Sequence, residues 1–157
     1  MGAALSERLR AWLVEAGVAF EVLEHAPVHT SEEAARVRGT RLEQGAKALV
    51  VRADERFLHC VLPASLKADN AALRAIAGTR KLRFATREEL AVLTGCEPGA
   101  VPPFGNLFGL PVLVDEALCA NEHVVFNAGS NAVSITMRCD DLVRLTGATV
   151  CRFGVRA

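Results

Sequence analysis

A single lysine, Lys47, stands at the entrance of an apolar run, Ala46–Ala53, that predicts a buried strand. A lysine in this place can pack its stem on apolar neighbours while its ammonium stays at a cleft, where it could hydrogen-bond a carbonyl, a carboxylate or a phosphate. Partial burial would lower its pKa. An ordinary surface lysine is the alternative, and this residue alone favours it because most lysines are solvated.

A rigid loop, 99–105, is the second candidate for a site. Pro102 and Pro103 fix two φ angles and remove two amide donors, while Gly99 and Gly105 allow the backbone to approach a ligand closely. Phe104 could form one wall of a small pocket. A purely structural turn explains the same residues equally well.

A short polar segment, Asn127-Ala128-Gly129-Ser130-Asn131, falls between two predicted strands. Its amides, the Ser130 hydroxyl and the asparagine side chains could bind a polar substrate group. The same residues are also typical of a hairpin turn. As a motif the segment is weak.

Several familiar chemistries find no support in the sequence. His25 and His29 are four residues apart, but Pro27 prevents a helical metal pair, and there is no HExxH, paired-cysteine, GxSxG, Walker or GxGxxG motif. His59 and Cys60 are expected to be core or sheet-face residues. We therefore expect chemistry without a metal or a cofactor.

Composition indicates one ordinary globular domain spanning residues 1–157, since 51% of the residues are hydrophobic and the formal net charge is zero. No stretch suits a membrane span or a signal peptide, and five cysteines without a CxxC pair favour reduced thiols in the cytoplasm. Zero net charge gives no global attraction to nucleic acid, and DNA is not an expected partner. Any phosphate contact would use two local basic groups, which contain Arg36, Arg38 and Arg41, and Arg80, Lys81, Arg83 and Arg87.

The predicted elements alternate irregularly along the chain. Apolar spacing and capping residues predict helices over 5–16, 31–38, 70–76, 87–94 and 141–146, with Thr30, Asp69, Thr86 and Asp140 as N-caps. Strands are predicted over 20–24, 46–53, 56–62, 81–85, 111–114, 124–127, 133–137 and 149–153. This mixture favours an α+β fold around a mixed, curled sheet over a regular βαβ array.

In order and spacing, these pieces resemble the YbaK/ProX-type aminoacyl-tRNA deacylases, relatives of the editing domain of bacterial prolyl-tRNA synthetases. The resemblance runs from about His25 to Leu145. It rests on the segments 29–34 (His-Thr-Ser-Glu-Glu-Ala), 45–47 (Gly-Ala-Lys), 94–105, 111–115 (Pro-Val-Leu-Val-Asp), 128–130 (Ala-Gly-Ser) and 134–135 (Ser-Ile).

The resemblance implies a mixed, barrel-like β-sheet with peripheral helices, and hydrolysis in trans of an ester that joins a wrong amino acid to the terminal ribose of a tRNA. It makes the lysine at position 47 the essential residue and places loop 99–105 beside the aminoacyl pocket. The expected partners are the acceptor end of an aminoacyl-tRNA and, for delivery, a synthetase. The expected substrate-binding residues are His29, Thr30, Gly99, Pro103, Phe104, Gly105, Asn127, Gly129, Ser130 and Ser134.

The hypothesis for the chemistry is that Lys47 donates to the ester carbonyl or to the terminal ribose-phosphate as negative charge develops, while backbone amides near Gly105 and Gly129 orient the substrate and a water. Ala48 follows the lysine where other branches carry Thr or Asn, which resembles the branch that clears Ser and Thr esters. Asn127, Ser130 and Ser134 could bind a substrate hydroxyl. Ala and Cys esters remain alternatives.

Two rival functions stay open at this point. The first is a module that binds aminoacyl-tRNA or a free amino acid without hydrolysing it. The second is a hydrolase for another activated ester, in which the pocket is kept and the tRNA contacts are lost. Binding that survives Lys47→Ala without turnover would favour the first, and activity insensitive to charge reversal at the arginines would favour the second.

Overall fold

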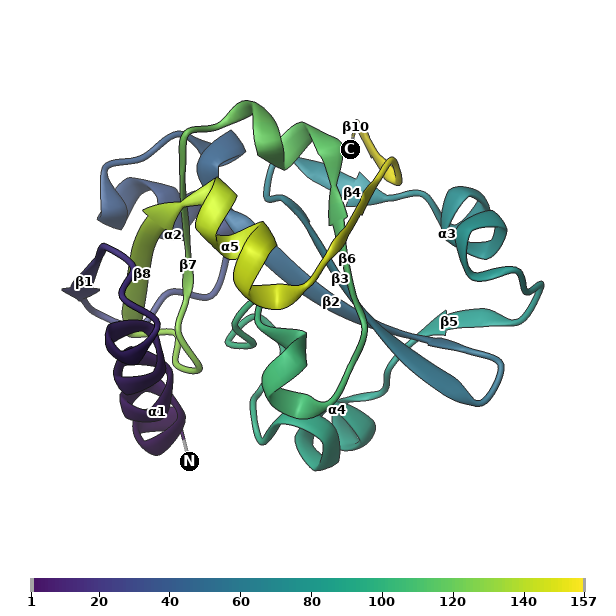
Figure 1. Cartoon of the computed structure of the whole chain (residues 1–157), viewed down its shortest axis with the longest axis horizontal. Helices are drawn as coiled ribbons and strands as arrows, with labels where there is room; N and C mark the ends of the chain where they lie inside the picture. Colours follow the sequence, from purple (N-terminus) through teal and green to yellow (C-terminus); the bar gives the residue numbers. More distant parts are fainter. Residues whose placement is uncertain (1, 157) are drawn as a thin grey trace.

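The computed structural model describes residues 2–156 and shows α-helices packed around three β-sheets (Figure 1). Within these residues there are five α-helices, most of them two turns long. They are α1 (Gly2–Glu15), α2 (Ser31–Arg38), α3 (Asn70–Ala77), α4 (Arg87–Thr94) and α5 (Cys139–Thr146). Three 3-10 turns, η1 (Leu42–Gln44), η2 (Gly105–Phe108) and η3 (Glu116–Ala120), complete the helical part.

A five-stranded mixed sheet, in the order β5-β2-β3-β6-β9, runs through the middle of the molecule. Its strands are β2 (Ala46–Ala53), β3 (Arg56–Pro63), β5 (Leu82–Phe84), β6 (Val112–Asp115) and β9 (Thr149–Cys151). The predicted β2–β3 hairpin is confirmed, with Ala53 opposite Arg56 and Asp54 at a positive φ of 56° in the tight turn. The β6 strand lies parallel to β3, and β9 lies parallel to β6.

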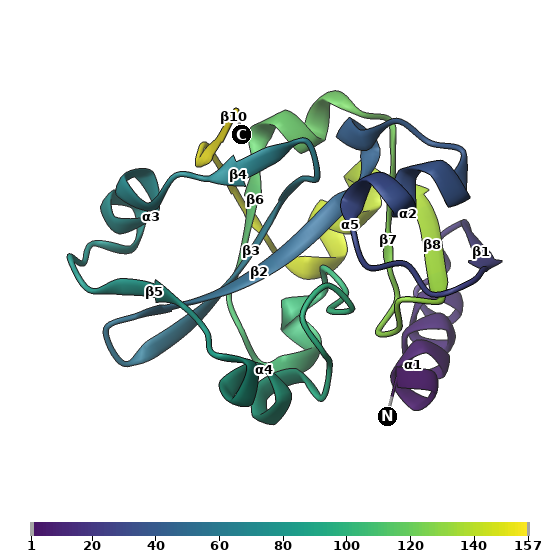
Figure 2. The same ribbon diagram turned by 180° about the vertical axis from the view of Figure 1, so that it is seen from behind.

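Two smaller sheets flank the central one. One has the order β1-β8-β7 and the other pairs β10 with β4; all of these pairs are antiparallel. The strands are β1 (Phe20–Glu24), β4 (Leu66–Ala68), β7 (His123–Asn127), β8 (Val133–Arg138) and β10 (Gly154–Arg156). An isolated parallel bridge from Gly45 to Val125 joins the entrance of β2 to β7. Figures 1 and 2 show β1, β7, β8, α1 and α2 at one end of the molecule, and α3 and β5 at the other.

The α+β class and the mixed sheet are confirmed, whereas the barrel-like closure is not. The described strands form separate sheets, and the five-stranded sheet keeps β5 and β9 as free edges. No described helix is both long enough and apolar enough to span a membrane.

The local signals in the sequence mark most helix ends correctly. Thr30 accepts a hydrogen bond from the Glu33 amide, as expected for the cap of α2. Thr86 and Glu89 form a complete capping box, in which the glutamate side chain also accepts from the Thr86 amide. The prediction of Asp140 as the cap of α5 is wrong, because the helix begins at Cys139, two residues earlier than predicted, and Arg138 occupies the cap position. The short strands β4 and β10 have too few residues for a sequence pattern, and they form only by pairing with each other.

Candidate functional site

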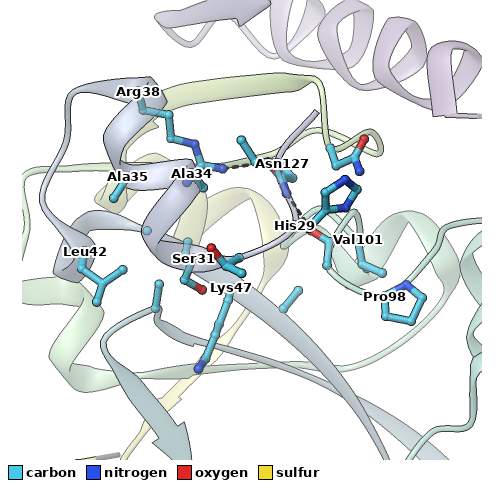
Figure 3. A pocket seen from close by; sticks show the side chains of 18 of the residues that line it. His29, Ser31, Ala34, Ala35, Arg38, Leu42, Lys47, Pro98, Val101 and Asn127 are labelled. Atoms are coloured by element: carbon cyan, nitrogen blue, oxygen red, sulfur yellow. Dashed lines mark hydrogen bonds between the residues drawn. The ribbon is translucent and has the colours of Figure 1, made fainter. Parts of the chain in front are cut away.

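A cavity of about 220 Å³ lies between α2, the start of β2, and the loop that begins at Glu97 (Figure 3). Five of the residues predicted from the sequence line it. They are His29, Thr30, Lys47, Gly99 and Asn127. Segments that are up to a hundred residues apart in the chain thus meet around one space.

Lys47 is the second residue of β2 and is half-buried. Burial lowers its pKa below the usual lysine value because the ammonium loses hydration, and the carboxylate of Glu32 opposes this shift. Figure 3 shows its amine reaching away from Arg38 and Asn127, along another side of the cavity. An ammonium of this kind can donate to a carbonyl or a phosphate oxygen and is more easily deprotonated than a solvated one.

Arg38, at the C-terminal end of α2, forms the most buried charge of the cavity wall. Its Nε donates to Ser134 Oγ and its Nη2 donates to Asn127 Oδ1, both at 2.8 Å. Among the described residues no carboxylate pairs with it, and burial lowers its pKa to about 10, so it is still charged at neutral pH. The Ser134 hydroxyl also lies 2.8 Å from His25 Nε2, so it can donate to a neutral imidazole there while it accepts from Arg38.

Asn127 connects Arg38 to the loop on the other side of the cavity. While its Oδ1 accepts from Arg38, its Nδ2 donates to the Gly99 carbonyl at 2.7 Å. A second connection lies next to it, where the Gly129 amide donates to the Ala100 carbonyl at 3.0 Å. Gly99 itself has a φ of +85°, which side chains rarely adopt. The loop is therefore held in place by the β7–β8 turn.

Three residues of the predicted loop site lie outside the cavity. Phe104 is fully buried and packs edge-on against Trp12 and Phe126. Pro103 and Gly105 are buried as well, and a Cβ on Gly105 would lie 2.5 Å from the Cβ of His59. This half of the loop is thus a core element, and only its first half reaches the cavity.

The other polar residues predicted to bind substrate have internal roles. Ser134 is buried between Arg38 and His25, and Ser130 accepts a hydrogen bond from the Ala132 amide within the turn. Gly129 has a φ of +85° and packs against Leu5, with no room for a Cβ. None of the three lines the cavity.

The sequence pattern missed several lining residues on α2 and just after it. Ser31, Ala34, Ala35 and Arg38 recur at helical spacing and form one face of α2 toward the cavity, a periodicity that was available in the sequence. Thr40 also lines the cavity, and its hydroxyl oxygen is buried without a hydrogen-bond partner among the described residues.

Comparison with known proteins matches this arrangement to one family. The family model described as "Aminoacyl-tRNA editing domain" matches residues 25–145, which include every lining residue of the cavity. The chain belongs to this aminoacyl-tRNA editing family. The expected resemblance is confirmed, and so is the enzyme class, aminoacyl-tRNA deacylase, to which its named relatives belong.

The alignments with known relatives extend over most of the chain. It is 32% identical to the multifunctional Ser/Thr-tRNA deacylase ProXp-y of Escherichia coli K12, over 97% of this chain and 94% of that protein. It is 27% identical to the prolyl-tRNA editing protein ProX of Acetoanaerobium sticklandii, over 87% of each. A crystal structure of a candidate trans-editing enzyme for prolyl-tRNA synthetase superimposes with a TM-score of 0.87 at 28% identity, covering 96% of both chains.

Proposed function

We propose that the protein hydrolyses mischarged aminoacyl-tRNA in trans, with Ser and Thr esters as the favoured substrates and Ala or Cys esters as alternatives. The observation that carries the proposal is the half-buried ammonium of Lys47 in a cavity enclosed by the matched segment. The 32% identity to a Ser/Thr-tRNA deacylase supports the choice of amino acid. Ala48, which follows the lysine, agrees with that branch.

In the proposed reaction, water attacks the ester carbonyl, the ester C–O bond breaks, and the products are a free amino acid and a tRNA with its ribose hydroxyl restored. An aminoacyl ester is already activated, so position and charge stabilisation suffice without a protein nucleophile. Lys47 donates to the carbonyl oxygen or to the terminal ribose-phosphate as negative charge develops. Loss of one such donor typically lowers the rate by about 10²–10³-fold.

The substrate hydroxyl needs a polar partner in the cavity wall. The sequence offers Asn127, Ser130 and Ser134 as candidates. The hydrogen bonds of Asn127 and Ser134 with Arg38 give these two residues a positioning role instead, and Ser130 accepts from the Ala132 amide within its turn. The hydroxyls of Ser31 and Thr40 are the better candidates, since neither appears in a hydrogen bond of the described residues and both residues line the cavity. His29 and Thr30 lie at the rim, where they would contact the ribose end.

The test is a panel of tRNAs charged with Ser, Thr, Ala, Cys and Pro, incubated with the wild type and with Lys47→Ala. We expect Lys47-dependent loss of the Ser and Thr esters above spontaneous hydrolysis. Arg8→Ala, which removes an exposed positive charge of α1 outside this cavity, is the charge-matched comparison. Near-wild-type deacylation by Lys47→Ala would contradict the role of Lys47 as the donor to the ester.

The rival reading is a non-catalytic module that binds aminoacyl-tRNA or an amino acid. It predicts binding of the charged tRNA by both proteins and turnover by neither. Delivery by a synthetase is part of the proposal, and mixing with a prolyl-tRNA synthetase would test it through a rise in the deacylation rate at limiting tRNA.

A further inference from the structure

A second hollow of about 460 Å³ continues from the cavity along β2. We call it the outer groove, and its walls include Lys47, Leu49, Lys67, Phe84 and Val155. Lys47 and Leu49 line both the cavity and the outer groove. A molecule that reached Lys47 from the groove side would therefore enter the cavity without crossing another surface.

Strand geometry places the groove residues on one face. Lys47, Leu49 and Val51 alternate along β2, so their side chains share a face, and Phe84 is opposite Val51 in the β2–β5 ladder. Val51 lies four residue steps along the strand from Lys47, which is about 13 Å at ~3.3 Å per residue. Figure 2 shows β4, α3 and β5 framing the middle of β2.

The groove contains an exposed aromatic ring and two cationic groups. Phe84 is 50% exposed, and it is the one aromatic side chain of residues 2–156 in the exposed class. Lys67 on β4 and Lys47 supply two ammonium groups. Asp69 is the one carboxylate in the wall, and its Oδ1 accepts from the amides of Ala71 and Ala72 as the cap of α3.

The wall of the groove formed by β10 is held in place by contacts with β4 and Asp115. Val155 belongs to β10, which pairs with β4 so that Val155 is opposite Lys67. The buried carboxylate of Asp115 accepts from the amides of Phe153 at 2.8 Å and Gly154 at 2.6 Å, and it holds the start of β10 against the central sheet. The groove is thus formed before any ligand arrives.

We propose that the outer groove receives the single-stranded 3′ end of the tRNA, with a base stacked on Phe84 and a phosphate at Lys67. This proposal rests on the proposed function, since it supplies the path by which the ester reaches Lys47. Aromatic rings beside cations are the usual platform for single-stranded nucleic acid, because every base offers a π-face and every linkage a negative charge. The 13 Å of strand between Lys47 and Val51 matches a few stacked nucleotides at ~3.4 Å each.

The test compares two substrates that carry the same amino acid. One is the aminoacyl-tRNA that the wild type clears best, and the other is that amino acid esterified to adenosine alone. Phe84→Ala should raise KM for the tRNA ester by about 5- to 100-fold, as expected for the loss of one stacked base, and leave kcat/KM for the adenosine ester unchanged. Phe84→Trp should restore the KM.

Lys67→Gln should raise KM for the tRNA ester and leave the adenosine ester unaffected. It should also reduce the magnitude of the slope of log affinity against log salt concentration by roughly 0.7, the value for one phosphate contact on a single strand. Val92→Ala is the matched control, because Val92 on α4 is 88% exposed and lies outside the groove. A Phe84→Ala effect equal on both substrates, or no effect on either, would overturn the proposal.

A direct binding measurement separates this proposal from the proposed function. A fluorescent single-stranded RNA ending in CCA is titrated with the wild type, Phe84→Ala and Val92→Ala. If the wild type hydrolyses no ester but binds this RNA in a Phe84-dependent way, the RNA-binding role of the groove is supported and the deacylase function is contradicted. If Phe84→Ala abolishes self-association and leaves RNA binding intact, the groove is a contact between copies, and the RNA proposal fails.

Discussion

The guanidinium of Arg38 and the amide of Asn127 are joined by a 2.8 Å hydrogen bond in which Nη2 donates to Oδ1. This bond links α2 to β7, and the same asparagine then donates to the Gly99 carbonyl. A helix, a strand and a loop that form the cavity are therefore held by two side chains. The shape of the cavity therefore depends on these two hydrogen bonds.

Arg38→Met is expected to destabilise the fold and widen the cavity. It leaves the buried hydroxyl of Ser134 and the partly buried amide oxygen of Asn127 without their donor. A buried polar group left unpaired typically costs about 1–3 kcal/mol. Urea unfolding measures the loss. Arg36→Met, on the exposed side of the same helix, should change stability by less than about 0.5 kcal/mol, and equal effects from both variants would contradict the positioning role.

Gly105→Ala is expected to destabilise the protein because the new Cβ would lie 2.5 Å and 2.6 Å from the Cβ and Cγ of His59. Overpacking of this kind usually costs about 1–3 kcal/mol, since the loop or the strand must move. Thermal unfolding is the measurement. Asn106→Ala alters the exposed neighbouring residue and should leave the transition nearly unchanged; a wild-type melting curve for Gly105→Ala would show that the loop moves freely.

His59 should make stability depend on pH below neutrality. Burial lowers its pKa from 6.5 to about 4, although its Nε2 lies 3.0 Å from the Pro102 carbonyl and can donate to it. Between these values the unfolded chain takes up a proton that the folded chain does not, so stability falls as pH drops from 6.5 to 4 and this loss stops below 4. Its size is about 3 kcal/mol at most.

Urea titrations at several pH values, repeated with His59→Gln, isolate this contribution. The glutamine retains a donor for Pro102 but does not titrate, so the difference between the two proteins should shrink as pH falls toward 4. Carboxylates that titrate in the same range are shared by both proteins and cancel in the comparison. Parallel curves for the two proteins would rule out His59 as the source.

Lys47 should set the alkaline limit of deacylation. A donor is active when protonated, and the pKa of Lys47 lies below its usual 10.5, so enzymatic turnover above background should decline as pH rises toward that lowered pKa. Rates of aminoacyl-ester hydrolysis from pH 6 to 10 check this. Lys47→Arg, slower overall, should show no such decline because a guanidinium stays charged; an identical decline in both would place the titrating group elsewhere.

The local sequence determined most of the secondary structure. Hydroxyl caps at Thr30 and Thr86, together with glycines in left-handed positions after α2, α3, α4 and α5, are short-range signals, and the helices begin and end near them. The β2–β3 hairpin followed from two β-rich runs around Asp54. Lys47 could be singled out because a charge at the entrance of an apolar strand needs an explanation.

The rest was decided by contacts between distant segments. Nothing near Asn127 or Ser134 in the chain reveals that Arg38, about ninety residues earlier, takes up their hydrogen bonds. Loop 99–105 is rigid for local reasons, yet packing of Phe104 on Trp12 and of Gly105 on His59 decides that its second half is core and only its first half lines the cavity. The sequence by itself determined the family, the elements and the lysine. Only the tertiary structure decided which polar groups form internal hydrogen bonds and which remain available to a substrate, because burial and hydrogen-bond partners are properties of the packed chain.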